Sequence, residues 1–215
     1  SKMAPDVKTV HEFLVDLAEH ARAPALQEVA ELQEIAKQDG VDELKPWDTT
    51  YYSEKLKQQQ FNLSQEALKP YFPAPKVIQG LFQIVQRLYG INIIERQAPV
   101  WHPDARYFEL EDQGQVIGGF FFDIYARTGK RGGAWMNGFR SRMQTLHGLQ
   151  KPICYMVCNF TPPVADQPAL LTHDEVITLF HEFGHGLHHM LTEVDNISVA
   201  GTHGVAWDAV ELPSQ

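Results

Sequence analysis

The residues best suited to chemistry lie in the last quarter of the chain. Six of the ten histidines fall within the 31 residues from His173 to His203. The most informative spacing is residues 181–185, His-Glu-Phe-Gly-His, an H-E-x-x-H pattern. On a helix, residues four apart lie about 40° apart around the axis, so both imidazoles can reach one metal ion. Glu182 lies beside them, where a carboxylate can take a proton from water. The pattern predicts metal-assisted hydrolysis.

The third metal ligand does not follow from the same helix. A catalytic zinc site usually has three protein ligands and keeps a fourth position open. His188 is seven residues beyond His181, and a straight helix would separate the two by about 10 Å. The longer H-E-x-x-H-x-x-G-x-x-H pattern is not continued either, because Leu191 stands where its third histidine belongs.

Two later carboxylates can complete the site. Asp208 and Glu211 follow His185 by 23 and 26 residues, after a stretch at 196–204 whose glycines and small residues suit a returning loop. A helical turn over 207–212 would place both on one face. One of them could bind the metal while the other orients a histidine, and the spacing does not choose between them.

The sequence around these residues is more specific than the H-E-x-x-H pattern. Residues 180–188 read F-H-E-F-G-H-G-L-H, and residues 207–215 read W-D-A-V-E-L-P-S-Q. Both stretches resemble the thimet oligopeptidase family of zinc metallopeptidases. Further similar stretches extend the resemblance over nearly the whole chain: 46–48, 51–55, 100–104 and 126–135.

The resemblance implies a role for each site residue. His181 and His185 correspond to two zinc ligands, Glu211 to the third ligand, and Glu182 to the catalytic carboxylate. Asp208 then remains a candidate for orienting a ligand. The family also implies one Zn²⁺ per chain, a zincin-like fold and short peptides as substrates. Family members continue beyond both ends of this sequence, so we expect a chain that binds zinc but is catalytically incomplete.

A non-catalytic zinc-binding or interaction module is the alternative function. An intact Glu182 argues against it, because a structural site needs no general base. Structural zinc sites also usually have four protein ligands, often cysteines. An aminopeptidase is a weaker alternative, since the chain lacks a G-x-M-E-N pattern that would bind a substrate N-terminus.

The first 90 residues are expected to be mainly helical. Residues 10–17 carry apolar side chains at i, i+3, i+4 and i+7, which is typical of an amphipathic helix. A second helix is expected over 25–37 and a polar one over 51–60. A stronger apolar stripe over 77–88 predicts a further helix.

Residues 91–165 have the pattern of a sheet region. Strands are expected at 91–95, 107–111, 116–125 and 152–160, and the second and third flank a hairpin turn at 112–114. The last of these runs is either an edge strand that aligns a substrate or a plain core strand. A glycine-rich segment at 129–133 lacks the spacing of a phosphate-binding loop and is expected to be a turn.

Residues 166–215 return to helix and carry the site. Thr172 and Glu175 have the spacing of a capping box. An apolar stripe follows on a face other than that of the histidines: Val176, Phe180, Phe183, Leu187 and Leu191. Helices, a small sheet and a final H-E-x-x-H helix together predict an α+β fold. We expect the whole of 1–215 to be part of one metallopeptidase catalytic domain.

Composition limits the other function classes. The chain has 215 residues and a net charge of −9, which disfavours a nucleic-acid surface. Its apolar runs are shorter than the roughly 20 residues that span a bilayer, so no membrane partner is expected. Cys154 and Cys158 have neither zinc-finger spacing nor enough partners for a disulfide framework, and are expected in the core. Low cysteine use fits a reducing compartment, and we expect a cytoplasmic protein.

Overall fold

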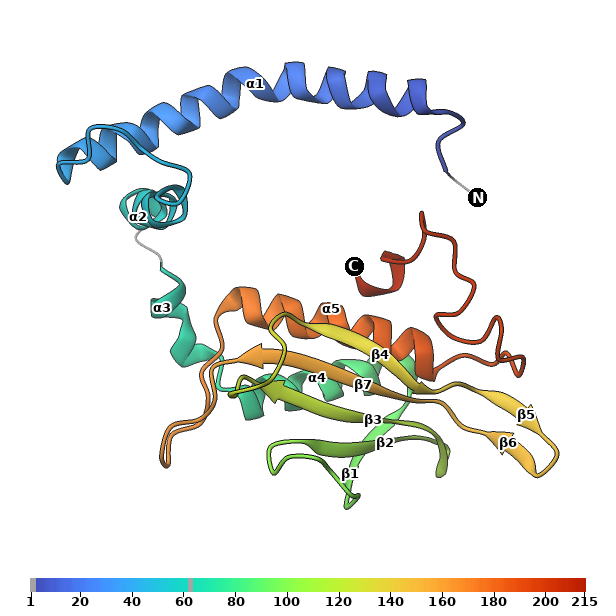
Figure 1. Ribbon diagram of the computed structural model, residues 1–215. Helices are drawn as coiled ribbons and strands as arrows, with labels where there is room; N and C mark the ends of the chain where they lie inside the picture. The colour runs from blue at the N-terminus through green and yellow to red at the C-terminus, as the bar shows by residue number, and fades with distance from the viewer. Residues whose placement is uncertain (1–2, 62–63) are drawn as a thin grey trace. The chain divides into compact units, whose positions relative to one another are not determined.

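The computed structural model describes residues 3–61 and 64–215. The chain divides into two compact units, Ser1–Ala67 and Leu68–Gln215. Figure 1 shows helices in the first unit, and a sheet with two long helices in the second. This mixture of helices and a small sheet confirms the predicted α+β class.

The first unit contains one long helix where the sequence predicted two. Helix α1 runs from Val7 to Gln38 without interruption, although Pro24 lies inside it. The Asp6 side chain begins the helix by accepting a hydrogen bond from the Thr9 backbone N–H at 2.7 Å. The predicted apolar stripe over 10–17 is on the helix but exposed. The amphipathic spacing therefore predicted that these residues are helical, but it did not predict what their apolar side chains would contact.

The second helix of this unit, α2, spans Thr49–Phe61 and confirms the predicted polar helix. It packs on the C-terminal end of α1 through a small buried cluster. Its buried members are Leu32, Ile35, Ala36 and Tyr52. A short helix, α3 (Gln65–Leu68), and a 3₁₀ turn, η1 (Lys69–Tyr71), follow.

The second unit is built on a five-stranded sheet of order β1-β2-β3-β7-β4. Its strands are β1 (Asn92–Arg96), β2 (Arg106–Asp112), β3 (Gln115–Tyr125), β7 (Ile153–Phe160) and β4 (Trp135–Arg140). The β2–β3 hairpin was predicted, and positive φ values of 48° at Gln113 and 80° at Gly114 fit its tight turn.

Strand β7 is a core strand and not an edge strand. It pairs in parallel with β3 on one side and antiparallel with β4 on the other. The idea that β7 aligns a substrate at the sheet edge is therefore wrong, and β4 occupies that edge. Most of β4 is exposed, and its sequence W-M-N-G-F-R lacks the alternation that reveals a strand. The two-stranded sheet of β5 (Met143–Thr145) and β6 (Gly148–Gln150) was missed as well, because each strand has three residues.

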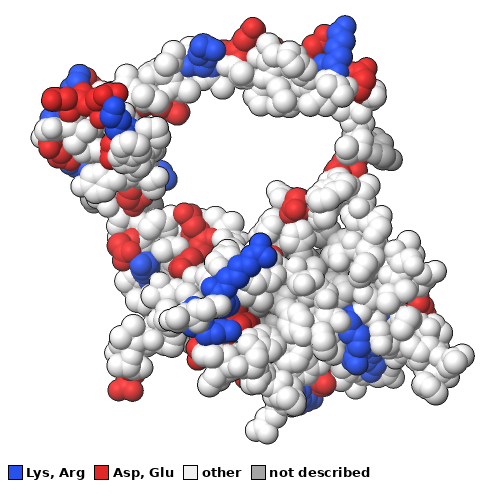
Figure 2. Space-filling view, in the orientation of Figure 1, with Lys and Arg blue, Asp and Glu red and all other residues white. Residues whose placement is uncertain are grey.

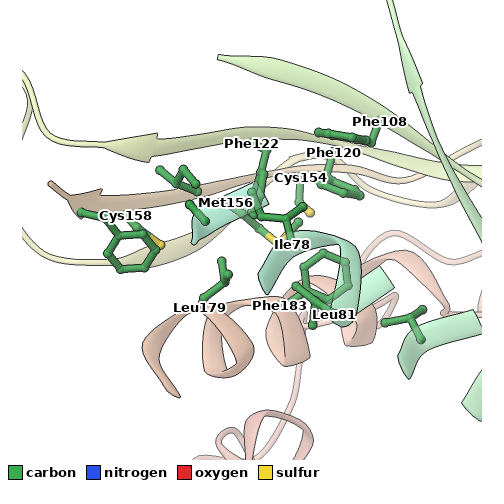
Figure 3. Packing of buried hydrophobic residues seen from close by; sticks show 14 of the residues in the cluster. Ile78, Leu81, Phe108, Phe120, Phe122, Cys154, Met156, Cys158, Leu179 and Phe183 are labelled. Atoms are coloured by element: carbon green, nitrogen blue, oxygen red, sulfur yellow. The ribbon is translucent and has the colours of Figure 1, made fainter. Parts of the chain in front are cut away.

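Two helices cover one face of the sheet. Helix α4 spans Ala74–Tyr89 and α5 spans His173–Met190. Figure 3 shows their apolar side chains against phenylalanines and sulfur-containing residues of the strands. The buried set includes Ile78, Leu81, Phe108, Phe120, Phe122, Cys154, Met156, Cys158, Leu179 and Phe183.

Both cysteines belong to this core, as predicted. Cys154 and Cys158 are fully buried on β7. Burial raises the pKa of the Cys158 thiol to about 12 and also raises the pKa of Cys154, so both thiols are protonated at neutral pH.

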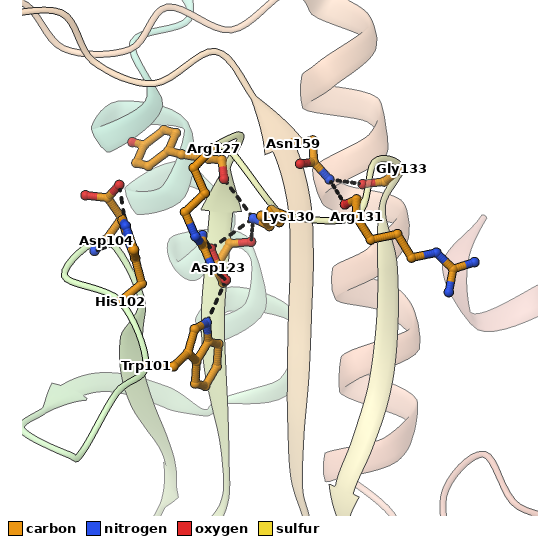
Figure 4. A network of polar contacts seen from close by, with 10 residues as sticks. Trp101, His102, Asp104, Asp123, Arg127, Lys130, Arg131, Gly133 and Asn159 are labelled. Carbon is orange, nitrogen blue, oxygen red and sulfur yellow. Dashed lines mark hydrogen bonds and ion pairs between the residues drawn. The ribbon is translucent and has the colours of Figure 1, made fainter.

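The opposite face of the sheet carries an aromatic layer and a buried ion cluster. Phe121 on β3 stacks on Tyr155 of β7 with ring centres 5.4 Å apart, and the Trp101 ring lies beside both. Asp123, at the end of this layer, is 2% exposed. Figure 4 shows it surrounded by three donor side chains.

Among the described residues, no helix has the length and apolar character needed to cross a membrane. On the face that Figure 2 shows, Lys and Arg side chains are interspersed with Asp and Glu.

Candidate metal centre

Helix α5 holds the H-E-x-x-H residues in a fixed orientation. Its start is the predicted capping box: the Thr172 hydroxyl accepts from the Glu175 N–H at 3.1 Å, and the Glu175 carboxylate accepts from the Thr172 N–H at 2.8 Å. Phe183 is buried against the sheet. Because that side of α5 is anchored in the core, His181 and His185 project from another side, where 35% and 14% of their side chains are exposed.

The chain after α5 turns back along the helix, as the glycine-containing stretch predicted. Gly201 lies against His189, so closely that a Cβ atom there would be 3.0 Å from both the Cα and Nδ1 atoms of His189. His189 is 1% exposed, and its Nε2 lies 3.1 Å from the Arg140 carbonyl oxygen. Burial lowers the pKa of His189, so its imidazole is neutral at pH 7. The returning segment is thereby fastened to the end of α5.

The return brings Glu211 to the two histidines. Glu211 Oε2 lies 3.0 Å from His185 Nε2 and 3.2 Å from His181 Nε2. The two imidazole rings are 4.9 Å apart at their centres and nearly perpendicular. The ligand atoms of these three side chains all lie within 4.8 Å of one another. Among residues 3–61 and 64–215, this is the only group of three or more histidine, cysteine, aspartate or glutamate side chains that could hold a metal ion.

The donor set fits a zinc ion. Two neutral imidazoles and a carboxylate are a common ligand set for catalytic zinc. Ligand atoms about 2 Å from a tetrahedral ion lie about 3.3 Å from each other. The separations of 3.0 and 3.2 Å from Glu211 Oε2 to the histidine nitrogens are close to that value.

Glu182 is on the same helix and differs in its surroundings from Glu211. It is 9% exposed, whereas 58% of the Glu211 side chain is exposed. Burial raises the pKa of Glu182, and the neighbouring His181 and His185 oppose that shift. A carboxylate in such a place is poised to exchange a proton with a water molecule.

Asp208, the other predicted carboxylate, is not a member of the three-residue cluster. Residues 207–211 form successive turns, and a 3₁₀ turn, η2 (Leu212–Ser214), follows. The expected helical turn over 207–212 is present as successive i to i+3 turns and not as an α-helix. The Ala209 N–H donates to the Ala206 carbonyl oxygen, and the Leu212 N–H donates to the Ala209 carbonyl oxygen. A role for Asp208 in orienting a histidine stays a prediction.

The structure adds a residue that the sequence argument missed. Ser214 is 8% exposed, and its hydroxyl oxygen lies 2.7 Å from the Glu211 carbonyl oxygen and 3.2 Å from Glu211 Oε2. The sequence signal for this contact was a serine three residues after a candidate ligand. At that spacing a serine hydroxyl often forms a hydrogen bond with the backbone.

An apolar hollow of about 580 Å³ adjoins the cluster. It is lined by His181 itself and by apolar side chains from α5 and η2, among them Val176, Ile177, Phe180 and Pro213. The cluster therefore borders a space that other molecules can enter.

Comparison with known proteins identifies the family. The sequence pattern of peptidase family M3 matches residues 1–215. The chain belongs to peptidase family M3. This confirms the resemblance to thimet oligopeptidases that the sequence around the H-E-x-x-H pattern indicated.

Several curated M3 relatives match the whole chain. Oligopeptidase A of Escherichia coli is 55% identical over 100% of this chain and 32% of its own length. Organellar oligopeptidase A of Arabidopsis thaliana is 45% identical, again over 100% of this chain, and over 28% of its own length. Dipeptidyl carboxypeptidase of E. coli is 39% identical over 100% of this chain and 32% of its own length. The chain thus spans about a third of the length of these M3 relatives.

Proposed function

We propose that this chain is the zinc-binding part of an M3 metallopeptidase that hydrolyses short peptides. The observation that carries the proposal is the convergence of His181 Nε2, His185 Nε2 and Glu211 Oε2 from α5 and the returning segment. In this proposal, residues 1–215 are part of one catalytic domain with a zincin-like arrangement of helix and sheet.

The three convergent residues would hold one Zn²⁺ per chain. The ion would supply Lewis acidity, which polarises a peptide carbonyl and makes water more acidic. The returning segment packs against α5 at Gly184 and against His189, and these contacts would hold Glu211 near the two histidines. Three protein ligands would leave a further coordination position for reactants, as catalytic sites require.

Glu182 is proposed as the general base. It takes a proton from the attacking water and delivers a proton to the leaving amine, so no net proton is gained or lost at the carboxylate. Its place beside both histidines on α5 supports this role. Because Glu182 is not one of the three convergent ligands, its carboxylate would stay available for this proton transfer.

Peptides are the proposed substrates. Relatives are named as oligopeptidases and as a dipeptidyl carboxypeptidase, so their names describe action on peptides. Because this chain spans about a third of their length, we propose that it binds zinc but turns over peptides slowly when alone. Donors that stabilise the transition state typically contribute ~100- to 1,000-fold, and we propose that these lie in the other two thirds of such enzymes.

Zinc stoichiometry of the purified chain tests the ligand set. We expect one zinc per chain in the wild type and in Glu182→Gln, because that carboxylate is not a ligand. Glu211→Ala should lose the metal and Asp208→Ala should keep it. Inductively coupled plasma mass spectrometry after dialysis against buffered zinc measures the zinc content.

The opposite result for the last two variants would show that the assignment of Glu211 is wrong. Coordination tests the alternative of a non-catalytic zinc module. X-ray absorption should report three protein ligands with an additional light oxygen donor, whereas a fourth protein ligand would favour the module.

A further inference from the structure

Gly184 lies between the two histidine ligands at a place where the chain approaches α5 very closely. A Cβ atom on Gly184 would lie 2.5 Å from the Pro213 carbonyl oxygen and 2.7 Å from the Ser214 Cα atom. Both are backbone atoms of η2, which begins one residue after Glu211. The backbone that carries Glu211 therefore rests directly on the surface of α5 at Gly184.

The helix itself gives no reason for a glycine at this position. Gly184 is in the interior of α5, and glycine there costs about 1 kcal/mol relative to alanine. Its φ is not in the left-handed region, since the positive-φ glycines are at other positions. The reason for the glycine is the close approach of η2.

Gly186 provides a contrast on the same helix. A Cβ atom there would meet the Met156 sulfur at 2.9 Å, and that sulfur is near the end of a flexible side chain. An added methyl group at Gly186 would disturb the core beneath α5. At Gly184 it would instead push on the backbone next to a proposed ligand.

Ser214 holds the same turn through hydrogen bonds to Glu211. Its backbone N–H donates to the Glu211 carbonyl oxygen at 3.1 Å. Its hydroxyl can donate either to that oxygen at 2.7 Å or to Glu211 Oε2 at 3.2 Å. The serine thus links the backbone of Glu211 to the orientation of its carboxylate.

We propose that Gly184 and Ser214 are positioning residues of the metal centre. Gly184 lets η2 seat against α5 at the distance at which Glu211 Oε2 meets both histidine nitrogens, and Ser214 holds the Glu211 carboxylate in that direction. This inference rests on the proposed zinc site. Residues that orient a ligand in this way typically change metal affinity by ~10- to 100-fold when they are replaced.

The test is zinc affinity of the full 215-residue chain, measured by competition with a chromophoric chelator. Gly184→Ala should weaken zinc binding ~10- to 100-fold, because the Pro213 carbonyl must move away from the new methyl group. Gly186→Ala is the matched control. It makes the same chemical change two residues along α5, and its zinc affinity should stay within about twofold of the wild type.

Ser214 gives a second, independent measurement. Ser214→Ala should weaken zinc binding, and Ser214→Thr, which keeps the hydroxyl, should restore part of the loss. The visible spectrum of the cobalt-substituted chain reports ligand geometry directly. It should change in Gly184→Ala and Ser214→Ala and stay unchanged in Gly186→Ala.

Each result has a distinct meaning. Wild-type zinc affinity and an unchanged cobalt spectrum in Gly184→Ala and Ser214→Ala would overturn the positioning roles while leaving the zinc site intact. Should Gly184→Ala fail to fold, as seen by circular dichroism, the Ser214 pair still tests whether the η2 turn positions Glu211, and wild-type zinc affinity in Ser214→Ala would then overturn the positioning proposal. A wild-type chain that binds no zinc would overturn the proposed function, and with it this inference.

Discussion

Asp123 and Glu211 are two carboxylates of the same unit in opposite surroundings. The Asp123 side chain is 4% exposed, and Arg127 and Lys130 both bond to its oxygens at 2.6 to 2.9 Å. The Trp101 indole N–H donates a further bond at 2.9 Å. The Glu211 side chain is 58% exposed, and its Oε2 faces two imidazoles instead of permanent cations.

The difference separates a structural cluster from a binding cluster. Burial alone would raise the pKa of Asp123, but the hydrogen bonds from Arg127, Lys130 and Trp101 outweigh it and hold the pKa well below its usual range. The charges of that cluster are paired within the chain, so removing one partner would leave a buried charge without compensation. Around Glu211, one carboxylate oxygen and two imidazole nitrogens converge. These atoms are metal ligands, so the cluster suits a bound cation.

Removing Asp123 should have the largest effect on stability. Asp123→Ala leaves Lys130 with a charge that is 5% exposed and without its carboxylate, so we expect a loss of about 3–5 kcal/mol in the free energy of unfolding. Urea denaturation in the presence of a chelator, followed by fluorescence, measures it. Asp104→Ala is the control, since that carboxylate is 43% exposed and should contribute less than about 1 kcal/mol. Equal losses in the two variants would contradict the distinction.

Zinc should stabilise the chain through one cluster and not the other. At a free zinc concentration 100 times the dissociation constant, the wild type should gain about 2.7 kcal/mol. Glu211→Ala should lose most of this increment, while its stability in chelator should stay within about 1 kcal/mol of the wild type because the side chain is largely exposed. Asp104→Ala should keep the full increment. A zinc increment that survives in Glu211→Ala would place the metal elsewhere.

Acid should weaken the Asp123 cluster by a smaller amount. Because folding lowers the pKa of Asp123, its contribution is complete above the unfolded pKa of about 3.9 and is lost as the pH falls toward the folded pKa. The stability difference between wild type and Asp123→Asn should therefore shrink by roughly 0.7 kcal/mol between pH 6 and pH 3.5. Urea titrations at the two pH values measure it, and a difference that grows on acidification would reverse the assigned sign.

Local patterns accounted for elements whose own sequence contains the signal. The capping box at Thr172, the helix stripe of α4 and the β2–β3 hairpin all follow from contacts within a few residues, and all were predicted. The H-E-x-x-H pair belongs to this class, because helical spacing alone puts His181 and His185 together.

Other features depend on contacts between distant residues. Strand β4 was missed, since its identity comes from pairing with β7 and not from its own alternation. The continuous α1 was predicted as two helices, whereas the helix continues through Pro24 although that residue has no N–H to donate. The sequence could not show that β4, and not β7, lies at the edge of the sheet, because strand order is set by tertiary pairing.

The sequence by itself determined the α+β class, the family, and two histidines on one helix face with a carboxylate beside them. The spacing left Asp208 and Glu211 open and the family resemblance favoured Glu211, but only the tertiary structure shows the Glu211 carboxylate against those histidines. It also showed why Gly184 is a glycine, since η2 rests on the helix at that point. The physical reason is range. Helical spacing fixes groups four residues apart, but 26 residues of returning chain can end in many places until packing against α5 selects one.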